Sequence, residues 1–301
     1  MAVSIVVVNW NSGSLLEGCV RSLLEHARGC EIIVVDNASE DASLDFPALT
    51  AGPVKLFRND SNLGYAAGNN VGWRQSSGTE ILFLNPDTEC LPQSVDCLRE
   101  ALGREPGVWA AGGQLVGPAG VAQAAYGGRP FPSVGSVAAA ALFLDRIWPV
   151  RRHGRAQGGE VDQPAAACLM VSRAALERTG GFDERFFPAW FEDVDLCRRI
   201  RDCGGRIRFE PAARFAHLGG YSARKLPRAR LLAIYHRNQI LYFRKHHGER
   251  AAARVRALVL TGLLLRSLGS LIRPPGRDSR IEACRAYGKA ARHIAAGRGD
   301  A

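Results

Sequence analysis

Three short motifs contain the acids and the imidazole that could bind a metal ion and move a proton. Asn85-Pro86-Asp87 directly follows the apolar run Glu80–Leu84. Glu192-Asp193-Val194-Asp195 opens a pattern with helical spacing, and His217 stands just before a pair of glycines. Mg²⁺ and Mn²⁺ take carboxylate oxygens and complete their shells with phosphate and water. These residue types fit chemistry on a diphosphate substrate.

Asp87 is the first metal ligand that the pattern predicts, because a carboxylate at the end of a buried strand can hold a hard cation. The metal would neutralise charge on a leaving diphosphate. Asn-Pro-Asp is also a common turn sequence, so an Asx turn is the alternative. His217 is the second predicted ligand, since neutral imidazole can bind a metal beside a carboxylate. A lone histidine more often has a structural hydrogen bond, and both alternatives stay open.

Glu192 and Asp193 are the predicted catalytic acids. A carboxylate can take the proton from an acceptor hydroxyl, and two adjacent acids raise one another's proton affinity. Acids in the first turn of a helix are also favoured by the helix dipole alone. A purely structural role for this cluster is therefore the alternative.

The predicted nucleotide-sugar contacts are polar residues and glycines near strand ends. Asp36 could accept from a base N–H or a ribose hydroxyl, and Gly64 would let the backbone approach a nucleotide closely. The other members of this set are Asn9, Asn62, Asn69 and Asn85. Neither Gly-x-Gly-x-x-Gly nor Gly-Lys-Ser/Thr occurs in the sequence, which argues against a dinucleotide dehydrogenase and a P-loop NTPase.

Alternating strand and helix patterns must position these residues. Buried strands are expected at 4–8, 31–35, 54–57, 80–84, 165–172 and 206–209, with helices at 15–27, 62–76, 94–102, 173–178 and 191–203. This alternation predicts an α/β fold with a doubly wound, mostly parallel central sheet flanked by helices. Ligands bind such sheets at the carboxyl ends of the strands, where four of the polar clusters fall. Residues 112–165 look less regular, as in a long acceptor-side insertion.

Composition narrows the class of protein. The chain has 301 residues, 47% of them hydrophobic, which is enough for a large core. Its eight cysteines occur singly, which predicts neither a zinc ribbon nor a disulfide framework and favours a reduced, cytoplasmic protein. The N-terminal apolar run is too short for a signal peptide.

The positive charge is concentrated at the C-terminus. Residues 224–301 hold 18 Lys/Arg and 4 Asp/Glu, while the whole chain has a net charge of +10. The apolar stretch 257–265 is interrupted at Arg266, so we expect it to be too short to span a bilayer. A basic helical extension over 226–301 could lie on an anionic membrane at its inner face, pack on the protein, or contact a second subunit as a homodimer. No motif supports nucleic-acid binding.

Taken in order, the motifs resemble a known family. Ile5–Asn11, Val34–Ser39, Asn62–Asn70, Leu84–Asp87 and Gly181–Phe187 with Glu192–Arg199 are similar to the ordered motifs of family 2 glycosyltransferases. The resemblance covers about residues 3–247 and is strongest to the bacterial rhamnosyltransferase-like branch. It implies the GT-A fold, with a catalytic domain over 1–225 whose nucleotide-binding half is 1–110 and whose acceptor half is 111–225.

The resemblance also implies roles for individual residues. Asp87 would be the carboxylate ligand of the metal motif, His217 a metal ligand, Asp193 the catalytic base and Asp36 the nucleobase contact. Asn85 stands where the family has the first Asp of its metal motif. That exchange replaces a charged contact with a neutral one to ribose or water, and it puts metal affinity in doubt.

The predicted function is inverting, Mg²⁺- or Mn²⁺-dependent glycosyl transfer from a dTDP- or UDP-linked sugar to a hydroxyl of a glycan or lipid-linked acceptor. The resemblance suggests dTDP-L-rhamnose as donor. A catalytically silent module that binds a nucleotide or glycan is one alternative. A nucleotidyltransferase ranks lower, because residues 9–13 after the first strand contain no Lys or Arg.

Overall fold

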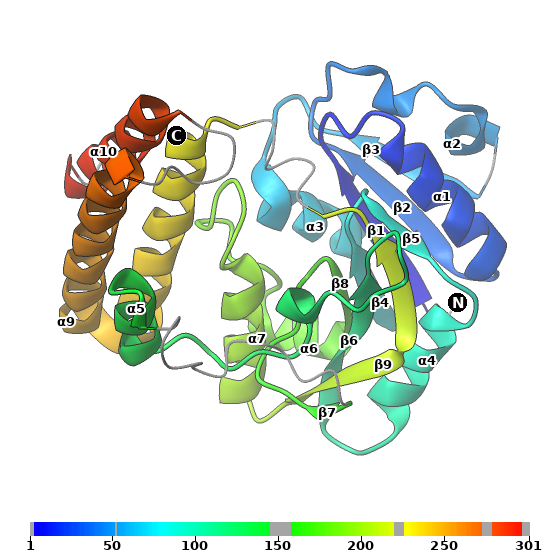
Figure 1. The fold of residues 1–301 in the computed structure, drawn as a ribbon. Coiled ribbons are helices and arrows are strands. Elements are labelled where there is room, and N and C mark those ends of the chain that lie inside the picture. The colour runs from blue at the N-terminus through cyan, green and yellow to red at the C-terminus, as the bar shows by residue number, and fades with distance from the viewer. Residues whose placement is uncertain (1–2, 52, 145–157, 220–225, 273–278, 297–301) are drawn as a thin grey trace. The chain divides into compact units, whose positions relative to one another are not determined.

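The computed structural model describes residues 3–51, 53–144, 158–219, 226–272 and 279–296 (Figure 1). The chain divides into two compact units. One unit comprises Met1–Phe131, Arg152–Pro188 and Glu192–Ser222; the other comprises Pro132–Arg151, Ala189–Phe191 and Ala223–Ala301. Two segments from within the range predicted as catalytic thus group with the C-terminal helices.

A nine-stranded sheet forms the centre of the first unit. Its strands are β1 (Val3–Asn9), β2 (Glu31–Asp36), β3 (Val54–Arg58), β4 (Glu80–Leu84), β5 (Thr88–Cys90), β6 (Val108–Val116), β7 (Gly159–Glu160), β8 (Cys168–Ser172) and β9 (Arg206–His217). The order is β3-β2-β1-β4-β8-β6-β9-β5, with β7 also paired to β9. The chain winds from β1 toward β3 and then crosses to β4. The carboxyl ends of β1 and β4 therefore form a topological switch point, where ligands bind in such sheets.

Most of the sheet is parallel, as predicted. β1 pairs in parallel with β2 and β4, β2 with β3, and β6 with β9. Every residue of β1 is buried, which explains its unbroken apolar run between two layers of helices. β8 runs antiparallel between β4 and β6, a direction that its apolar run could not reveal.

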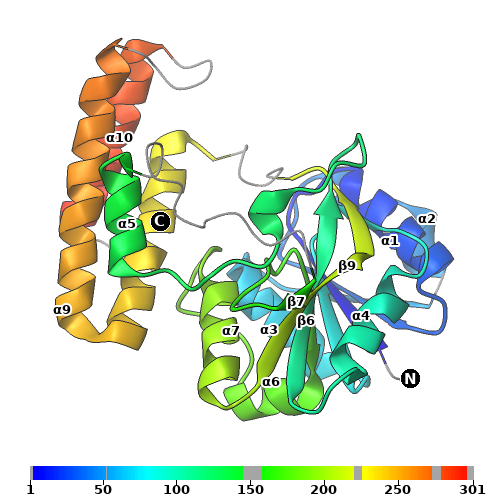
Figure 2. The ribbon, with the colours of Figure 1, turned by 60° about the horizontal axis from the view of Figure 1, so that its bottom comes forward.

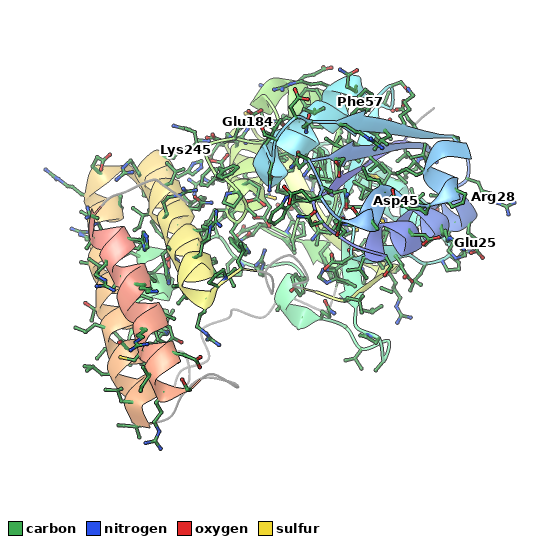
Figure 3. The ribbon with its side chains drawn as sticks, turned by 90° about the horizontal axis from the view of Figure 1, so that it is seen from above. Glu25, Arg28, Asp45, Phe57, Glu184 and Lys245 are labelled. Carbon is green, nitrogen blue, oxygen red and sulfur yellow. The ribbon has the colours of Figure 1, made fainter. Side chains whose placement is uncertain are left out.

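Helices cover both faces of the sheet. The helices are α1 (Leu15–His26), α2 (Pro47–Ala51), α3 (Gly64–Gln75), α4 (Ser94–Gly103), α6 (Arg173–Thr179) and α7 (Glu192–Asp202), with 3₁₀ turns η1 (Ala42–Leu44) and η2 (Ala124–Tyr126). Apolar residues of α1, α2 and α4 belong to the core on one face. Those of α3, α6 and α7 belong to the core on the other. Figure 3 labels Glu25, in the last turn of α1, and Arg28, which follows this helix.

Three strands and two helices before the C-terminal extension went unpredicted: β5, β6, β7, α2 and α5. β6 was missed because Ala and Gly fill its centre and give no β-branched signal. β5 has only three residues, too few for a pattern. α5 (Val134–Ala141) lies in the region expected to be irregular, and Ser133 and Ser136 form a capping box at its start.

The second unit is helical, as expected for the extension. It contains α5, α9 (Arg228–Ile272) and α10 (Arg280–Ala296), and α10 lies along α9 in both ribbon views (Figures 1 and 2). Gly248 interrupts α9 with φ +81° and ψ 173°, so two helices meet there. The apolar stretch in α9 is longer than expected. Within the described residues, α9 alone is long and apolar enough to cross a membrane, with an 18-residue window of mean hydropathy 1.6.

Residues Ala189–Phe191 are held by the first half of α9. The buried Asn238 amide donates to the carbonyls of Ala189 and Trp190, at 2.8 and 3.1 Å. The Phe191 ring packs against Tyr235 and Tyr242. Trp190 and Phe191 both have positive φ, a backbone state that bulky residues keep only when their surroundings enforce it.

Gly72 lets α3 lie directly against the sheet. A Cβ at this position would be 2.2 Å from Val6 Cγ1 and 3.3 Å from Val35 Cγ2. We predict that Gly72→Ala lowers the free energy of unfolding by about 1–3 kcal/mol, because the core cannot absorb the methyl without shifting. Urea titration followed by circular dichroism measures the change. Gly103→Ala is the control, since nothing lies within 4 Å of its Cβ position; equal stability of the two variants would contradict the prediction.

Candidate active site

Asn9 and Asp36 meet at the carboxyl ends of β1 and β2. They are register partners, and Asn9 Nδ2 lies 2.7 Å from Asp36 Oδ1. Asp36 Oδ2 accepts from the backbone N–H of Ser39 at 3.1 Å. Both side chains are buried. The structure thus brings these two predicted nucleotide contacts together in one polar network.

A second network connects this edge to the start of α3. Asn62 Oδ1 accepts from Gly64 N at 2.9 Å, and Asn37 Nδ2 donates to Gly64 O at 3.0 Å. Gly64 has φ +82°, and a Cβ there would lie 2.8 Å from Phe187 and 3.0 Å from the Pro188 carbonyl. Glycine is therefore required at position 64 because the loop at Phe187 and Pro188 packs directly against its backbone.

Asn69 and its neighbour Asn70 play different parts. Asn69 Nδ2 donates within α3 to Tyr65 O, and its buried Oδ1 has no hydrogen-bond partner among the described residues. Asn70 donates to Phe182 O and Glu184 Oε1 and accepts from Phe182 N, which anchors the segment after α6 to α3. Figure 3 labels Glu184. Asn70 is a structural residue that the motif contained without revealing its role.

Strand pairing brings Asp87 and His217 together. β5 and β9 are antiparallel, with Thr88 opposite His217, and Leu218 N donates to Asp87 O at 3.2 Å. Nε2 of His217 lies 3.5 Å from Asp87 Oδ1, and both side chains are largely buried. The two predicted metal ligands, far apart in sequence, are therefore neighbours.

Gln123 fixes which nitrogen of His217 carries the proton. Its amide nitrogen donates to the His217 carbonyl at 2.7 Å, which leaves its Oε1 facing Nδ1 at 2.8 Å. An amide oxygen can only accept, so Nδ1 donates and the lone pair of neutral imidazole stays on Nε2, toward Asp87. The Tyr126 ring packs edge-on against the imidazole.

This pair fits a divalent cation that also binds phosphate. The described residues contain no group of three or more His, Cys, Asp and Glu that could hold a metal by itself. One carboxylate and one imidazole leave most of an octahedral shell to diphosphate oxygens and water, as Mg²⁺ sites commonly do. Asn85 is held through its backbone: its N–H donates to Ala167 O, and its carbonyl accepts from Thr88 N.

The three acids of the α7 motif have different environments. Glu192 is 5% exposed, and burial raises the pKa of its carboxyl well above the ordinary value; the nearby charges of Asp193 and Asp195 add to this. Asp193 keeps partial solvent contact and accepts from Ala166 N and Val194 N. Asp195 is fully buried and pairs with Arg199 at 2.8 Å, so it is structural.

Two residues near the acids were missed at the level of sequence. Arg129 places its guanidinium 3.7 Å from Asp193 Oδ2, and its buried Nε has no partner among the described residues. Tyr65 donates to Ala166 O at 2.8 Å. Burial raises the pKa of Tyr65, and the neighbouring carboxyl groups add to this effect. Tyr65 stood inside a recognised motif, whereas nothing in the pattern marked Arg129.

A mixed α/β sheet with a carboxylate–imidazole pair and a separate acid cluster defines a GT-A-type glycosyltransferase. The chain belongs to glycosyl transferase family 2, whose family description matches residues 4–178. It is 29% identical over 285 residues to the N-acetylglucosaminyl-diphospho-decaprenol L-rhamnosyltransferase of Mycobacterium tuberculosis, covering 87% of this chain and 91% of that one. It is also 29% identical to the pre-mycofactocin glycosyltransferase of the same organism, over 71% of this chain and 42% of the relative.

Solved structures agree on the fold. The mannosyltransferase PcManGT from Pyrobaculum calidifontis, solved with GDP-Man and Mn²⁺, has a TM-score of 0.55 at 17% identity, covering 98% of this chain and 86% of that one. GalNAc-T7, solved with UDP, GalNAc and Mn²⁺, has a TM-score of 0.57 at 16% identity. That match covers 96% of this chain and 55% of the GalNAc-T7 chain. The predicted GT-A fold and rhamnosyltransferase-like branch are confirmed; the site residues stay predictions.

Burial of Glu192 generates a prediction about pH. Its folded-state pKa lies above the ordinary value of 4.5, so the folded protein holds this proton after the unfolded chain has lost it. Stability is therefore lost as pH rises above about 4.5, by up to about 1.4 kcal/mol per pH unit until the raised pKa is reached. We expect Glu192→Gln to raise the Tm relative to the parent, by an amount that grows from pH 5 to pH 8.

Differential scanning fluorimetry across this pH range measures the effect. Glu177→Gln on the exposed face of α6 is the matched control and should show no growing difference. A constant Tm difference for Glu192→Gln at every pH would mean that Glu192 ionises normally in the folded protein.

Proposed function

We propose that this glycosyltransferase is metal-dependent and inverting, and that it transfers L-rhamnose from dTDP-L-rhamnose to a hydroxyl of a lipid-linked glycan. The observation that carries the mechanism is the backbone segment Ala165–Ala167. Ala166 N donates to Asp193, and Ala167 O accepts from Asn85 N at the end of β4. The predicted base and the strand that leads to Asp87 are thus bonded to the same three residues.

Asp193 is the base in this proposal. It keeps more solvent contact than Glu192, whose raised pKa favours the neutral acid. Asp193 takes the proton of the acceptor hydroxyl while the hydroxyl oxygen bonds to the anomeric carbon. The bond from that carbon to the diphosphate oxygen breaks on the opposite face, so the configuration inverts. Glu192, as a neutral acid, orients the acceptor by hydrogen bonding, and Arg129 holds Asp193 in position.

Asp87 and His217 would hold Mg²⁺ or Mn²⁺ in this scheme. When bound, the cation offsets negative charge on the departing diphosphate. The chain's own part is to direct Nε2 of His217 toward Asp87 through the Gln123 contact at Nδ1, and to hold Asp87 beside it through the β5–β9 pairing. Asn9, Asp36, Asn62, Gly64, Asn69 and Asn85 form the nucleotide side of the site.

The donor and acceptor rest on relatives. The relative that aligns over 87% of this chain carries L-rhamnosyltransferase in its name, and that name places its acceptor on decaprenyl diphosphate. A polyprenyl-linked acceptor and a deoxysugar donor are therefore the first candidates for the substrates of this chain. Turnover with dTDP-L-rhamnose, UDP-GlcNAc, UDP-glucose and GDP-mannose, read as nucleoside diphosphate release with and without a polyprenyl-diphosphate-linked GlcNAc acceptor, tests this order. Release from none of them with Mg²⁺ or Mn²⁺ would favour a silent binding module.

Asp193→Asn tests the base. We expect kcat to fall by about 10²–10⁴-fold, because a general base contributes that much, while dTDP affinity stays unchanged. Single-turnover assays and calorimetric titration with dTDP measure the two quantities. Asp202→Asn, at the exposed end of the same helix, is the control. Normal turnover by Asp193→Asn would remove this residue from the base role.

Gln123→Leu tests the metal pair without reference to activity. Losing the partner that sets ring orientation and tautomer should weaken Mn²⁺ binding by about 10–100-fold. Paramagnetic resonance of free Mn²⁺, titrated in the presence of dTDP, gives the affinity. Gln75→Leu on the exposed face of α3 should bind Mn²⁺ as the parent does. If Gln123→Leu bound Mn²⁺ as tightly as the parent does, the cation would not be held by Asp87 and His217.

A further inference from the structure

The last turns of α9 bury serines and expose leucines, whereas Val255, Val259 and Leu263 fill the buried face of the turns before them. Arg266 is the one charged residue in the sequence between Ala257 and Ile272. Its guanidinium donates to the carbonyls of Ala140 and Ala141 at the end of α5. Ser267 and Ser270 are buried as well, and Ser267 Oγ lies 3.2 Å from the Cys284 carbonyl of α10. A helix in water normally shows the opposite arrangement.

From Ala257 to Ile272 the outward face of the same helix is uncharged. Six of the twelve large hydrophobic residues exposed in the described part of the chain fall within 18 residues of sequence: Leu264, Leu265, Leu268, Leu271, Ile272 and Ile281. Leu264 and Leu268 are one helical turn apart and more than half exposed, and Ile272 is 82% exposed. Because Ala257 and Thr261 lie on the same face, the stripe continues along four turns without a charge. Soluble surfaces rarely carry such a contiguous stripe without a binding partner.

The other helix of the pair is cationic. α10 runs antiparallel to α9, since Ser267 bonds to Cys284 and Arg256 to Ala295. Its exposed residues Arg285, Lys289 and Arg292 recur at helical spacing. Residues 249–272 and 280–296 hold 8 Lys/Arg against 2 Asp/Glu, so this hairpin attracts anionic surfaces and repels a second copy of itself.

We propose that the α9–α10 hairpin, defined as Glu249–Ile272 and Arg280–Ala296, lies on an anionic lipid bilayer with its leucine face in the interface. The partner is a membrane surface, which matches both the apolar stripe and the positive charge. α9 does not span the bilayer. α10 lies alongside it, and a spanning arrangement would place the exposed Arg285, Lys289 and Arg292 in hydrocarbon.

This inference deepens the proposed function, because a membrane-bound enzyme meets a lipid-linked acceptor where that acceptor lies, at the inner face of the membrane. Its evidence comes from the helical unit alone. Vesicle binding is measured without donor or acceptor, so a failed proposal about the sugar or the base leaves this test untouched, and the reverse also holds.

The full-length chain is mixed with phosphatidylcholine vesicles, with or without phosphatidylglycerol, and separated by flotation. We expect the parent to float with anionic vesicles at low salt. The double variant Leu264→Glu/Leu268→Glu should lose binding by about tenfold or more, because two apolar anchors are replaced by charges of the wrong sign. Arg285→Gln/Lys289→Gln/Arg292→Gln should lose binding by a similar factor, and only to anionic vesicles.

Val121→Glu is the control, since Val121 is 68% exposed in a turn of the other unit. It should float as the parent does. Circular dichroism checks that each variant keeps its helix content, which exposed positions should permit. A parent chain that never floats would overturn the proposal. So would a Leu264→Glu/Leu268→Glu variant that floats normally, or a leucine-dependent dimer in light scattering without any vesicle binding.

Discussion

The candidate active site depends on the antiparallel insertion of β8 between β4 and β6. This insertion places the segment before β8, Ala165–Ala167, at the carboxyl end of β4. Its backbone bonds to Asn85, to the Tyr65 hydroxyl and to the Asp193 carboxylate. Backbone groups that bind side chains from three elements fix distances more tightly than flexible side chains could. The rest of the site, from the switch point to the start of α7, is arranged around this short segment.

Much of this arrangement could be predicted from the sequence. Unbroken apolar runs predicted the parallel strands. The polar residues after these strands were expected at one edge of the sheet, and Asn9 and Asp36 do lie together there. The approach of His217 to Asp87 was not derivable from local pattern, because it depends on β5, a three-residue strand. Gln123 and Arg129 lie in a stretch without periodicity, so no signal marked them. Only the resemblance to the family assigned Asp87 and His217 to the same metal, because hydrophobic periodicity carries no information about such a pair.

Adjacent acids need not share a task. Glu192 and Asp193 are neighbours in sequence, yet one is buried with a raised pKa and the other keeps contact with water and a guanidinium. A buried carboxyl that resists ionisation lowers the stability of the folded state at neutral pH. Such local loss is typical of sites where the surroundings must set the protonation state of a group.

The bond from Asn238 to Ala189 and Trp190 has a consequence for how this chain can be divided. Residues 189–191 belong with α9, yet Glu192 and Asp193 follow them directly in the chain. The helical part is therefore no removable appendage: cutting the chain at residue 225 would free the backbone just upstream of α7. Replacing the C-terminal helices would therefore also require new partners for residues 189–191. The two parts are thus expected to be inherited as one piece.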